Sequence, residues 1–305
     1  KLASQGGETP LLLGAPPFIA LDSAKPEHSL LAKQLYDVVS ADLRYSRYFT
    51  LLQDGPHFNG ANLKAIKNDW KLKSAGWLLT AQASESAGRL AVSVQLTDLN
   101  SGETVFDRYY RQEGKYLRAI AHKLSDDIVR QLTGKTGIAH SQIAFSNAHS
   151  GHKELFIMDY DGANLRQLTH HASITILPRF APDRKSIAYT SYKDGNPDLF
   201  LLDLERGKMR PVSRDQGLNI AGGFSPDGTQ LLMTLSREKS PNLYLKNLID
   251  GSVTQLTQHF GADSSPTFSP DSQQVAFVSD RSGNPQIDVL DITTRRAKRL
   301  TSLNW

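Results

Sequence analysis

The residues best suited to nucleophilic chemistry recur at a fixed step along the chain. Ser225 stands in the segment Gly-Phe-Ser-Pro-Asp, which resembles a nucleophile elbow but lacks the glycine expected two residues after the serine. Its equivalents 44 residues away are Ala181 and Ser269. A catalytic nucleophile would not recur in each unit and be replaced by alanine in one of them. We therefore interpret Ser225 as a turn residue and expect neither a catalytic residue nor an enzyme.

Three aspartates follow the same 44-residue step, namely Asp183, Asp227 and Asp271. Each follows a proline, and an aspartate carboxylate in a turn accepts hydrogen bonds from nearby backbone N–H groups. Their recurrence is explained by turn geometry, so we do not interpret them as an acid/base pair.

Histidines offer the one arrangement that could hold a metal ion. His149 and His152 flank a predicted turn and could share an ion on a hairpin, while His170 and His171 lie in a predicted loop. The chain has no cysteine, no His-Glu-x-x-His segment and no paired carboxylate near these histidines. The sequence predicts no metal site, although whether His149 and His152 bind an ion stays open. Glycine-rich phosphate loops are also missing, so we expect no cofactor.

The 44-residue step itself predicts the fold of the second half of the chain. Phe180, Phe224 and Phe268 each precede a short turn with proline at its second position, and short apolar runs follow in phase. In the second unit we expect strands at 177–180, 186–191, 198–204 and 208–213. Repeats of this length built from four short strands are typical of β-propeller blades.

The first repeat, from about residue 142 to residue 169, lacks the Phe-x-Pro-Asp strand that would be the innermost of its blade. The next such strand would centre 44 residues after Phe268, beyond Trp305. We therefore expect about 3.7 blades, and we interpret the chain as truncated from a larger ring.

Residues 1–137 have no 44-residue repeat. Their apolar residues follow helical spacing in some segments and strand spacing in others. Helices are predicted at 26–45, 61–70 and 116–132. Strands are predicted at 18–21, 48–52, 75–84, 89–98 and 103–111. We expect a small α/β domain at 1–137, followed by the propeller at 138–305.

Composition excludes some classes of function. The net charge is +4 from 35 Lys and Arg against 31 Asp and Glu, and no basic run alternates with exposed aromatics, so nucleic acid is not an expected partner. No apolar run approaches the length needed to span a bilayer, and we expect no membrane insertion. The first residue is Lys, which fits either a removed leader or the edge of a longer sequence.

Several segments together resemble the TolB family of the Tol-Pal system. They are Pro-Phe-Ile-Ala at 17–20, Val-Ser-Ala-Asp-Leu-Arg at 39–44, Leu-Thr-Gly at 132–134, Ile-Ala-Phe at 143–145 and Phe-Ser-Pro-Asp-Gly at 224–228. The resemblance implies a non-enzymatic periplasmic scaffold with a six-bladed propeller. It also implies two partners: the peptidoglycan-associated lipoprotein Pal, and the inner-membrane protein TolA, which the family engages through its extreme N-terminal segment. Residues 1–10 show no clear match to that segment.

The loops that lead from one blade into the next are the predicted binding surface. They span residues 170–177, 214–221 and 258–265, and in the TolB family this face receives Pal. The residues predicted to contact a partner are Thr175, Leu177, Asn219, Ala221, Asp263 and Ser264.

Two other classes of function remain open. The chain could be the accessory propeller of a prolyl-oligopeptidase-type peptidase that lacks its catalytic domain. It could also be a carbohydrate-binding or ion-binding propeller, for which only Trp305 is available as a tryptophan outside the first domain.

Overall fold

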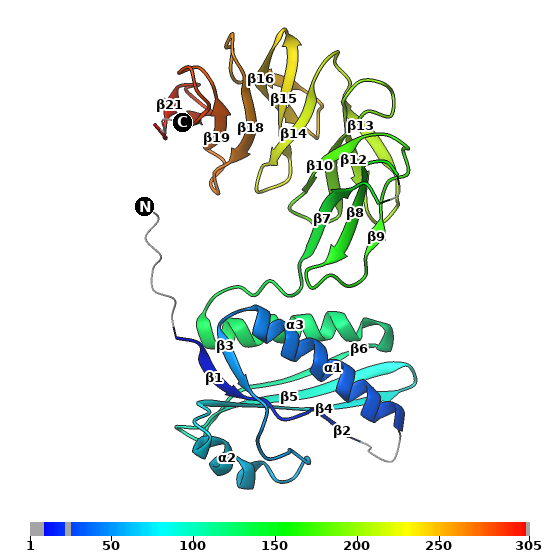
Figure 1. Ribbon diagram of the computed structural model, residues 1–305, viewed down its shortest axis with the longest axis vertical. Coiled ribbons are helices and arrows are strands. Elements are labelled where there is room, and N and C mark those ends of the chain that lie inside the picture. The colour runs from blue at the N-terminus through cyan, green and yellow to red at the C-terminus, as the bar shows by residue number, and fades with distance from the viewer. Residues whose placement is uncertain (1–8, 22–25, 150, 303–305) are drawn as a thin grey trace. The chain divides into compact units, whose positions relative to one another are not determined.

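The computed structural model describes residues 9–21, 26–149 and 151–302 (Figure 1). The fold consists of two compact units. Unit 1 comprises Lys1–Ser141 together with Asp159–Asp161, and unit 2 comprises Gln142–Met158 and Gly162–Trp305. Trp305 and residues 1–8 lie outside the described residues, so the structure does not address the expectations that involve them.

Unit 1 contains a mixed six-stranded sheet of order β3-β1-β4-β5-β6, with β2 beside β4. Strand β1 pairs in parallel with both β3 and β4, whereas β4, β5 and β6 form an antiparallel meander. The strands are β1 Leu11–Gly14, β2 Ile19–Ala20, β3 Phe49–Leu52, β4 Trp77–Ser86, β5 Arg89–Asp98 and β6 Thr104–Glu113. Strand β1 is absent from the predicted elements. It is short and apolar without alternation, as expected for a parallel strand with neighbours on both edges.

Helices α1 (Pro26–Tyr45) and α3 (Leu117–Thr133) pack together on one face of this sheet (Figure 1). A short 3₁₀ turn, η1 (Gly114–Tyr116), leads into α3. That helix ends at Gly134, which adopts a left-handed conformation with φ of 70° and donates its N–H to the carbonyl of Arg130. Leu79 of β4 belongs to the core formed with these two helices.

Helix α2 (Leu63–Leu72) belongs to a second, smaller core. Its Trp70 is fully buried and packs with Leu78, the neighbour of Leu79 on β4. Successive strand residues point to opposite faces, so α2 covers the face opposite α1 and α3.

Unit 2 consists of one three-stranded and three four-stranded antiparallel sheets, which are the blades of an incomplete propeller. Blade 1 is β7 Gln142–Asn147, β8 Glu154–Asp159 and β9 Arg166–Gln167. Blade 2 is β10 Thr175–Phe180, β11 Ser186–Ser191, β12 Asp198–Asp203 and β13 Met209–Ser213. Blade 3 is β14 Asn219–Phe224, β15 Gln230–Glu238, β16 Ser240–Asn247 and β17 Val253–Gln255. Blade 4 is β18 Asp263–Phe268, β19 Gln274–Ser279, β20 Gln286–Asp291 and β21 Ala297–Arg299. The predictions of four-stranded blades and of a first blade without its innermost strand are confirmed.

The inner strands β10, β14 and β18 each contain a bulge, and they approach one another closely. At the bulge of β14, a Cβ on Gly222 would lie 2.6 Å from Cγ and 2.6 Å from the carbonyl oxygen of Pro266 in β18. Glycine is therefore required where these two strands meet. Within the described part of the chain, no helix is long and apolar enough to cross a membrane.

Candidate functional site

One end of the blades collects the segments that the sequence predicts to bind a partner. Neighbouring strands of a blade are antiparallel, so the connections β9–β10, β13–β14 and β17–β18 lie at the same end as the hairpin tips β11–β12, β15–β16 and β19–β20. We call these six segments the loop face. Each of the three connections joins two consecutive blades, so their conformation depends on both.

The polar residues that begin the inner strands are buried beneath the loop face. Thr175, Asn219 and Asp263 stand 44 residues apart, and each of them is fully buried. The hydroxyl of Thr175 lies 3.3 Å from Nδ1 of His171 and 3.3 Å from Oγ of Ser191. Buried polar groups of this kind are normally hydrogen-bonded. These three side chains thus hold the loops in place and do not form the outer surface.

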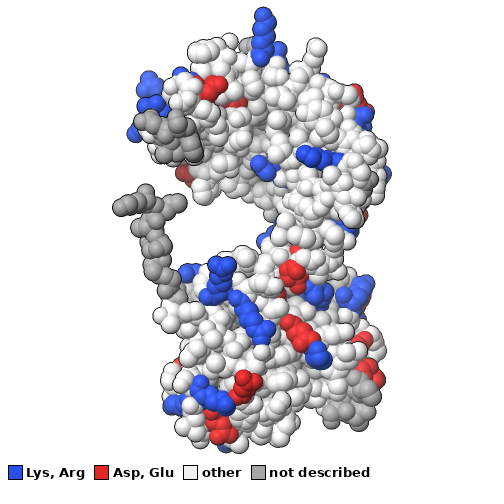
Figure 2. Space-filling model, in the orientation of Figure 1, with Lys and Arg blue, Asp and Glu red and all other residues white. Residues whose placement is uncertain are grey.

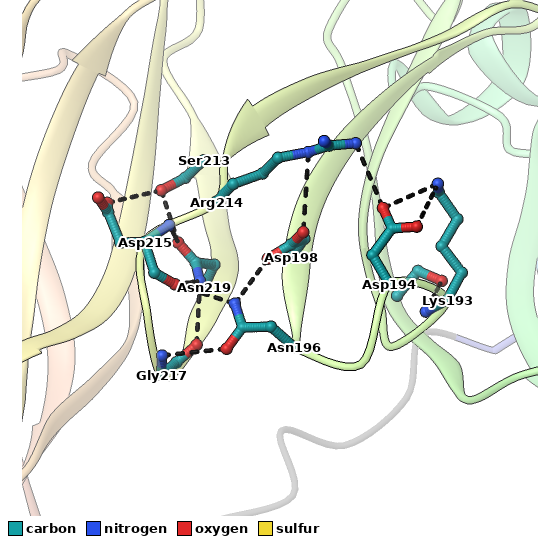
Figure 3. Close-up of polar contacts among 10 residues, drawn as sticks. Lys193, Asp194, Asn196, Asp198, Ser213, Arg214, Asp215, Gly217 and Asn219 are labelled. Carbon is teal, nitrogen blue, oxygen red and sulfur yellow. Dashed lines mark hydrogen bonds and ion pairs between the residues drawn. The ribbon is translucent and has the colours of Figure 1, made fainter.

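Asn219 closes the connection between blades 2 and 3 into a compact loop (Figure 3). Its Oδ1 accepts hydrogen bonds from Oγ of Ser213 at 2.6 Å and from the backbone N–H of Asp215 at 3.1 Å. Its Nδ2 donates to the carbonyls of Asp215 and Gly217 at 2.6 and 3.0 Å. One buried amide therefore fixes the backbone of residues 213–217.

An ion-pair network ties the same loop to blade 2 (Figure 3). Arg214 donates from Nη2 to Asp194 at 3.3 Å, and its Nε lies 3.7 Å from Oδ2 of Asp198. Lys193 also donates to Asp194, at 3.0 Å, and this hydrogen bond is the main reason that the pKa of Asp194 is lowered. Asn196 donates to the buried Asp198 at 2.6 Å. The exposed pairs contribute little stability individually, but together they restrict the loop.

A cation recurs at the hairpin tip of each four-stranded blade, at the equivalent positions Lys193, Arg237 and Arg281. Each lies over an aromatic ring, with centroid distances of 5.0, 5.2 and 5.3 Å. Arg237 donates to Asp215 at 2.8 Å from Nε, and Arg281 donates to Asp263 at 2.8 Å from Nη2. These cations are matched by carboxylates of the propeller itself. On the side drawn in Figure 2, the Lys and Arg groups of unit 2 lie in several separate places.

The six predicted contact residues divide into a buried and an accessible set. Thr175, Asn219, Ala221 and Asp263 are buried. Leu177 is 38% exposed and lies in the bulge of β10 with a φ of 57°, and Ser264 is half-buried. The structure thus places only Leu177 and Ser264 where a partner could touch the side chain. That all six contribute to partner binding stays a prediction.

Phe260 is the loop-face residue that sequence reasoning missed. It lies in the β17–β18 connection and is 91% exposed. Alignment of the repeats places Ala172 and Gln216 at the equivalent positions, and both are exposed as well. An aromatic at a position occupied by alanine and glutamine in the neighbouring repeats was the available signal.

The arrangement that could chelate a metal ion is in unit 1 and not near His149 or His152. Asp42, His122 and Asp161 each offer one atom that could bind a metal ion, a carboxylate oxygen or a ring nitrogen. These three atoms lie within 4.8 Å of one another. The guanidinium of Arg118, however, hydrogen-bonds Asp161 and approaches Nε2 of His122 to 3.5 Å. A cationic side chain already lies among these groups, so we assign no metal site to them.

Comparison with known families decides the identity of the chain. The family model of the TolB amino-terminal domain matches residues 4–105, and that of the TolB β-propeller domain matches residues 129–304, more than half of the chain. The chain belongs to the TolB family. The amino-terminal match distinguishes TolB from a peptidase propeller, which would share only the blades. Family membership, and not any absence from the structure, supports the conclusion that the protein is not an enzyme.

Individual relatives and a solved structure agree with the family assignment. The Tol-Pal system protein TolB of Syntrophotalea carbinolica is 36% identical over 163 residues, which cover 52% of this chain and 38% of that protein. The protein TolB homolog of Chlorobium chlorochromatii is 36% identical over 157 residues, which cover 50% and 36%. The crystal structure of TolB from Acinetobacter baumannii is 29% identical with a TM-score of 0.86, and the match covers 97% of this chain and 72% of that one. The aligned segments span well under half of each curated relative.

Proposed function

We propose that this TolB-family chain is a periplasmic scaffold of the Tol-Pal system. In this proposal the propeller, residues 138–305, binds the peptidoglycan-associated lipoprotein Pal through the loop face. The N-terminal domain, residues 1–137, links it to TolA and other inner-membrane Tol proteins. Joining an outer-membrane lipoprotein to inner-membrane proteins would support envelope integrity and constriction during cell division.

The observation that carries the proposal is the rigid construction of the loop face. Buried Thr175, Asn219 and Asp263 begin the three complete inner strands, and Asn219 alone fixes one connection with four hydrogen bonds. Loops held in one conformation lose less entropy on binding, so a face built this way is suited to a protein partner.

The test uses the purified 305-residue chain and the purified soluble domain of Pal, with affinity measured by calorimetry. Ser264→Arg places a long charged side chain at the second residue of β18, next to the loop face, and Gln273→Arg introduces an arginine at the exposed opposite end of the same blade. We expect Ser264→Arg to weaken binding about tenfold or more and Gln273→Arg to leave it unchanged. An equal effect of both substitutions would show that the loop face is not the binding site.

The proposed link to TolA requires a separate test, because residues 1–8 lie outside the described residues. Binding of a purified periplasmic domain of TolA would be measured with the chain and with a variant that lacks residues 1–8. Binding that survives the deletion would show that another part of the N-terminal domain makes the contact. If neither the chain nor the shortened variant binds TolA, the proposed link to TolA is wrong.

A further inference from the structure

Phe260 is the most exposed large apolar side chain among the described residues. It is 91% exposed, and its ring lies with a centroid 4.3 Å from that of His259 at an interplanar angle of 40°. A phenyl ring this exposed leaves most of its apolar surface in water, so a partner that covers it would gain the free energy of that burial.

The backbone on both sides of Phe260 is held firmly by two blades. In blade 3, Asn242 accepts the N–H of His259 at 2.8 Å, and the hydroxyl of Ser240 donates to the carbonyl of His259 at 2.6 Å. In blade 4, Asp280 accepts the N–H of Ala262 at 2.8 Å. These contacts fix the loop and direct its tip outward.

Gly261 makes this arrangement possible. A Cβ at Gly261 would lie 2.0 Å from Oδ1 of Asp280, so a larger residue would force the Asp280 side chain to move. Its N–H donates to Nδ1 of His259 at 3.1 Å, which also orients the ring beneath Phe260. The backbone that carries the phenyl ring is therefore preorganised.

The repeats provide an internal control for the role of the side chain. The equivalent connections are built with Ala172 and Gln216, so neither the turn nor the blade contact requires an aromatic. Aromatic side chains that insert into a partner commonly dominate the binding energy of a protein interface.

We infer that Phe260 is the apolar anchor of the loop face, and that it inserts into an apolar pocket on the soluble domain of the lipoprotein; this inference rests on the proposed function. The loop-face cations Arg237 and Arg281 pair with carboxylates of the propeller itself, so the exposed phenyl ring is the apolar group that this connection offers. A second copy of the chain is a less suitable occupant. The open pockets of about 490 and 550 Å³ at the β4–β5 hairpin are lined by charged residues such as Glu85. A more enclosed pocket beside Tyr45 and Val129 measures about 110 Å³, less than the roughly 150 Å³ of a cavity that holds benzene.

The experiment measures the affinity of Pal's soluble domain for four forms of the full chain: wild type, Phe260→Ala, Phe260→Trp and Ile249→Ala. Ile249 is the matched control because it is 80% exposed at the opposite end of blade 3. We expect Phe260→Ala to weaken binding about 30-fold or more. Phe260→Trp should keep most of the affinity, and Ile249→Ala should equal wild type. Sedimentation of each form alone reports self-association.

The outcomes separate the two proposals. If wild type binds and Phe260→Ala binds equally well, the anchor is overturned while the proposed function stands. If the wild-type chain does not bind Pal, both the proposed function and the Phe260 anchor are overturned. If Phe260→Ala abolishes self-association of the chain but leaves Pal binding unchanged, the occupant is a second copy and the inference is overturned. Because the Phe260 side chain is 91% exposed, its truncation should leave the fold intact.

Discussion

Nδ1 of His122 lies 2.8 Å from Oδ2 of Asp42, and both side chains are buried. The pair joins α3 to α1 across 80 positions of sequence. Oγ of Ser125 donates to the same carboxylate oxygen at 2.9 Å. The segment Ala-Asp-Leu-Arg at 41–44, which carries the family resemblance, therefore contributes its aspartate to the packing of two helices.

Replacement of Asp42 by alanine should destabilise unit 1 by about 3 kcal/mol, because His122 loses its buried carboxylate partner and Ser125 loses one of its two acceptors. The control is Asp37→Ala on the same helix, where Asp37 is exposed and pairs only with Lys33. That change should cost less than about 0.5 kcal/mol. Urea unfolding followed by the fluorescence of buried Trp70 measures both. Equal midpoints for the two variants would contradict the prediction.

Asn219→Ala should loosen the connection between blades 2 and 3. The substitution removes four hydrogen bonds and takes from the N–H of Asp215 and the carbonyl of Gly217 their Asn219 partner, so we expect a loss of about 3 kcal/mol and faster hydrogen exchange at residues 214–218. Gln216→Ala alters an exposed side chain of the same loop and should change neither quantity. If exchange at 214–218 were as slow in Asn219→Ala as in wild type, the amide would not be what fixes the loop.

Gly222→Ala should destabilise the propeller by about 2 kcal/mol, since the added Cβ would lie 2.6 Å from atoms of Pro266 and would force the inner strands of blades 3 and 4 apart. The adjacent Gly223 provides the control. A Cβ there would approach no atom closer than 3.4 Å, and Gly223→Ala should change stability by less than about 1 kcal/mol. Thermal unfolding followed by circular dichroism measures the difference. A larger loss for Gly223→Ala than for Gly222→Ala would show that the strands are not in close contact at Pro266.

The regular parts of the fold could be predicted because their periodicity is local. The bounds of α1 are those predicted, since its apolar face repeats at helical spacing over 20 residues. Strand β11 also has the predicted bounds, because a proline turn and an Asp-Gly turn enclose it. The missing inner strand of blade 1 followed from counting repeats. In the first two cases neighbouring residues carry the signal, and in the third the 44-residue step carries it.

Features that depend on long-range contacts could not be predicted. Strand β1 is too short to show a period, and its place between β3 and β4 is set by sheet pairing. The pairing of Asp42 with His122 depends on the packing of two helices. Thr175 and Asn219 were expected at the surface because polar residues in loops are usually exposed, but a polar residue that begins an inner strand is buried by the adjoining connection.

The stability of the propeller should fall as the pH drops below about 6.5, because burial lowers the pKa of His171 from its ordinary value of 6.5. A base with a lowered pKa binds fewer protons in the folded state than in the unfolded state. Its full stabilising effect is therefore present above pH 6.5 and is lost as the pH falls through 6.5 toward the lowered value. Near His171, the charges of Glu154 and Asp194 oppose the shift and that of Lys193 assists it.

His171→Gln isolates this contribution, since the other titrating groups are common to both proteins. Nδ1 of His171 lies 2.8 Å from Oγ of Ser191, and an amide oxygen can accept a hydrogen bond from that hydroxyl. Thermal midpoints of wild type and variant would be compared between pH 8 and pH 5. We expect a constant difference above pH 7 and a shift in favour of the variant below about pH 6.5. Midpoints that fall in parallel over the whole range would show that His171 titrates alike in the folded and unfolded chains.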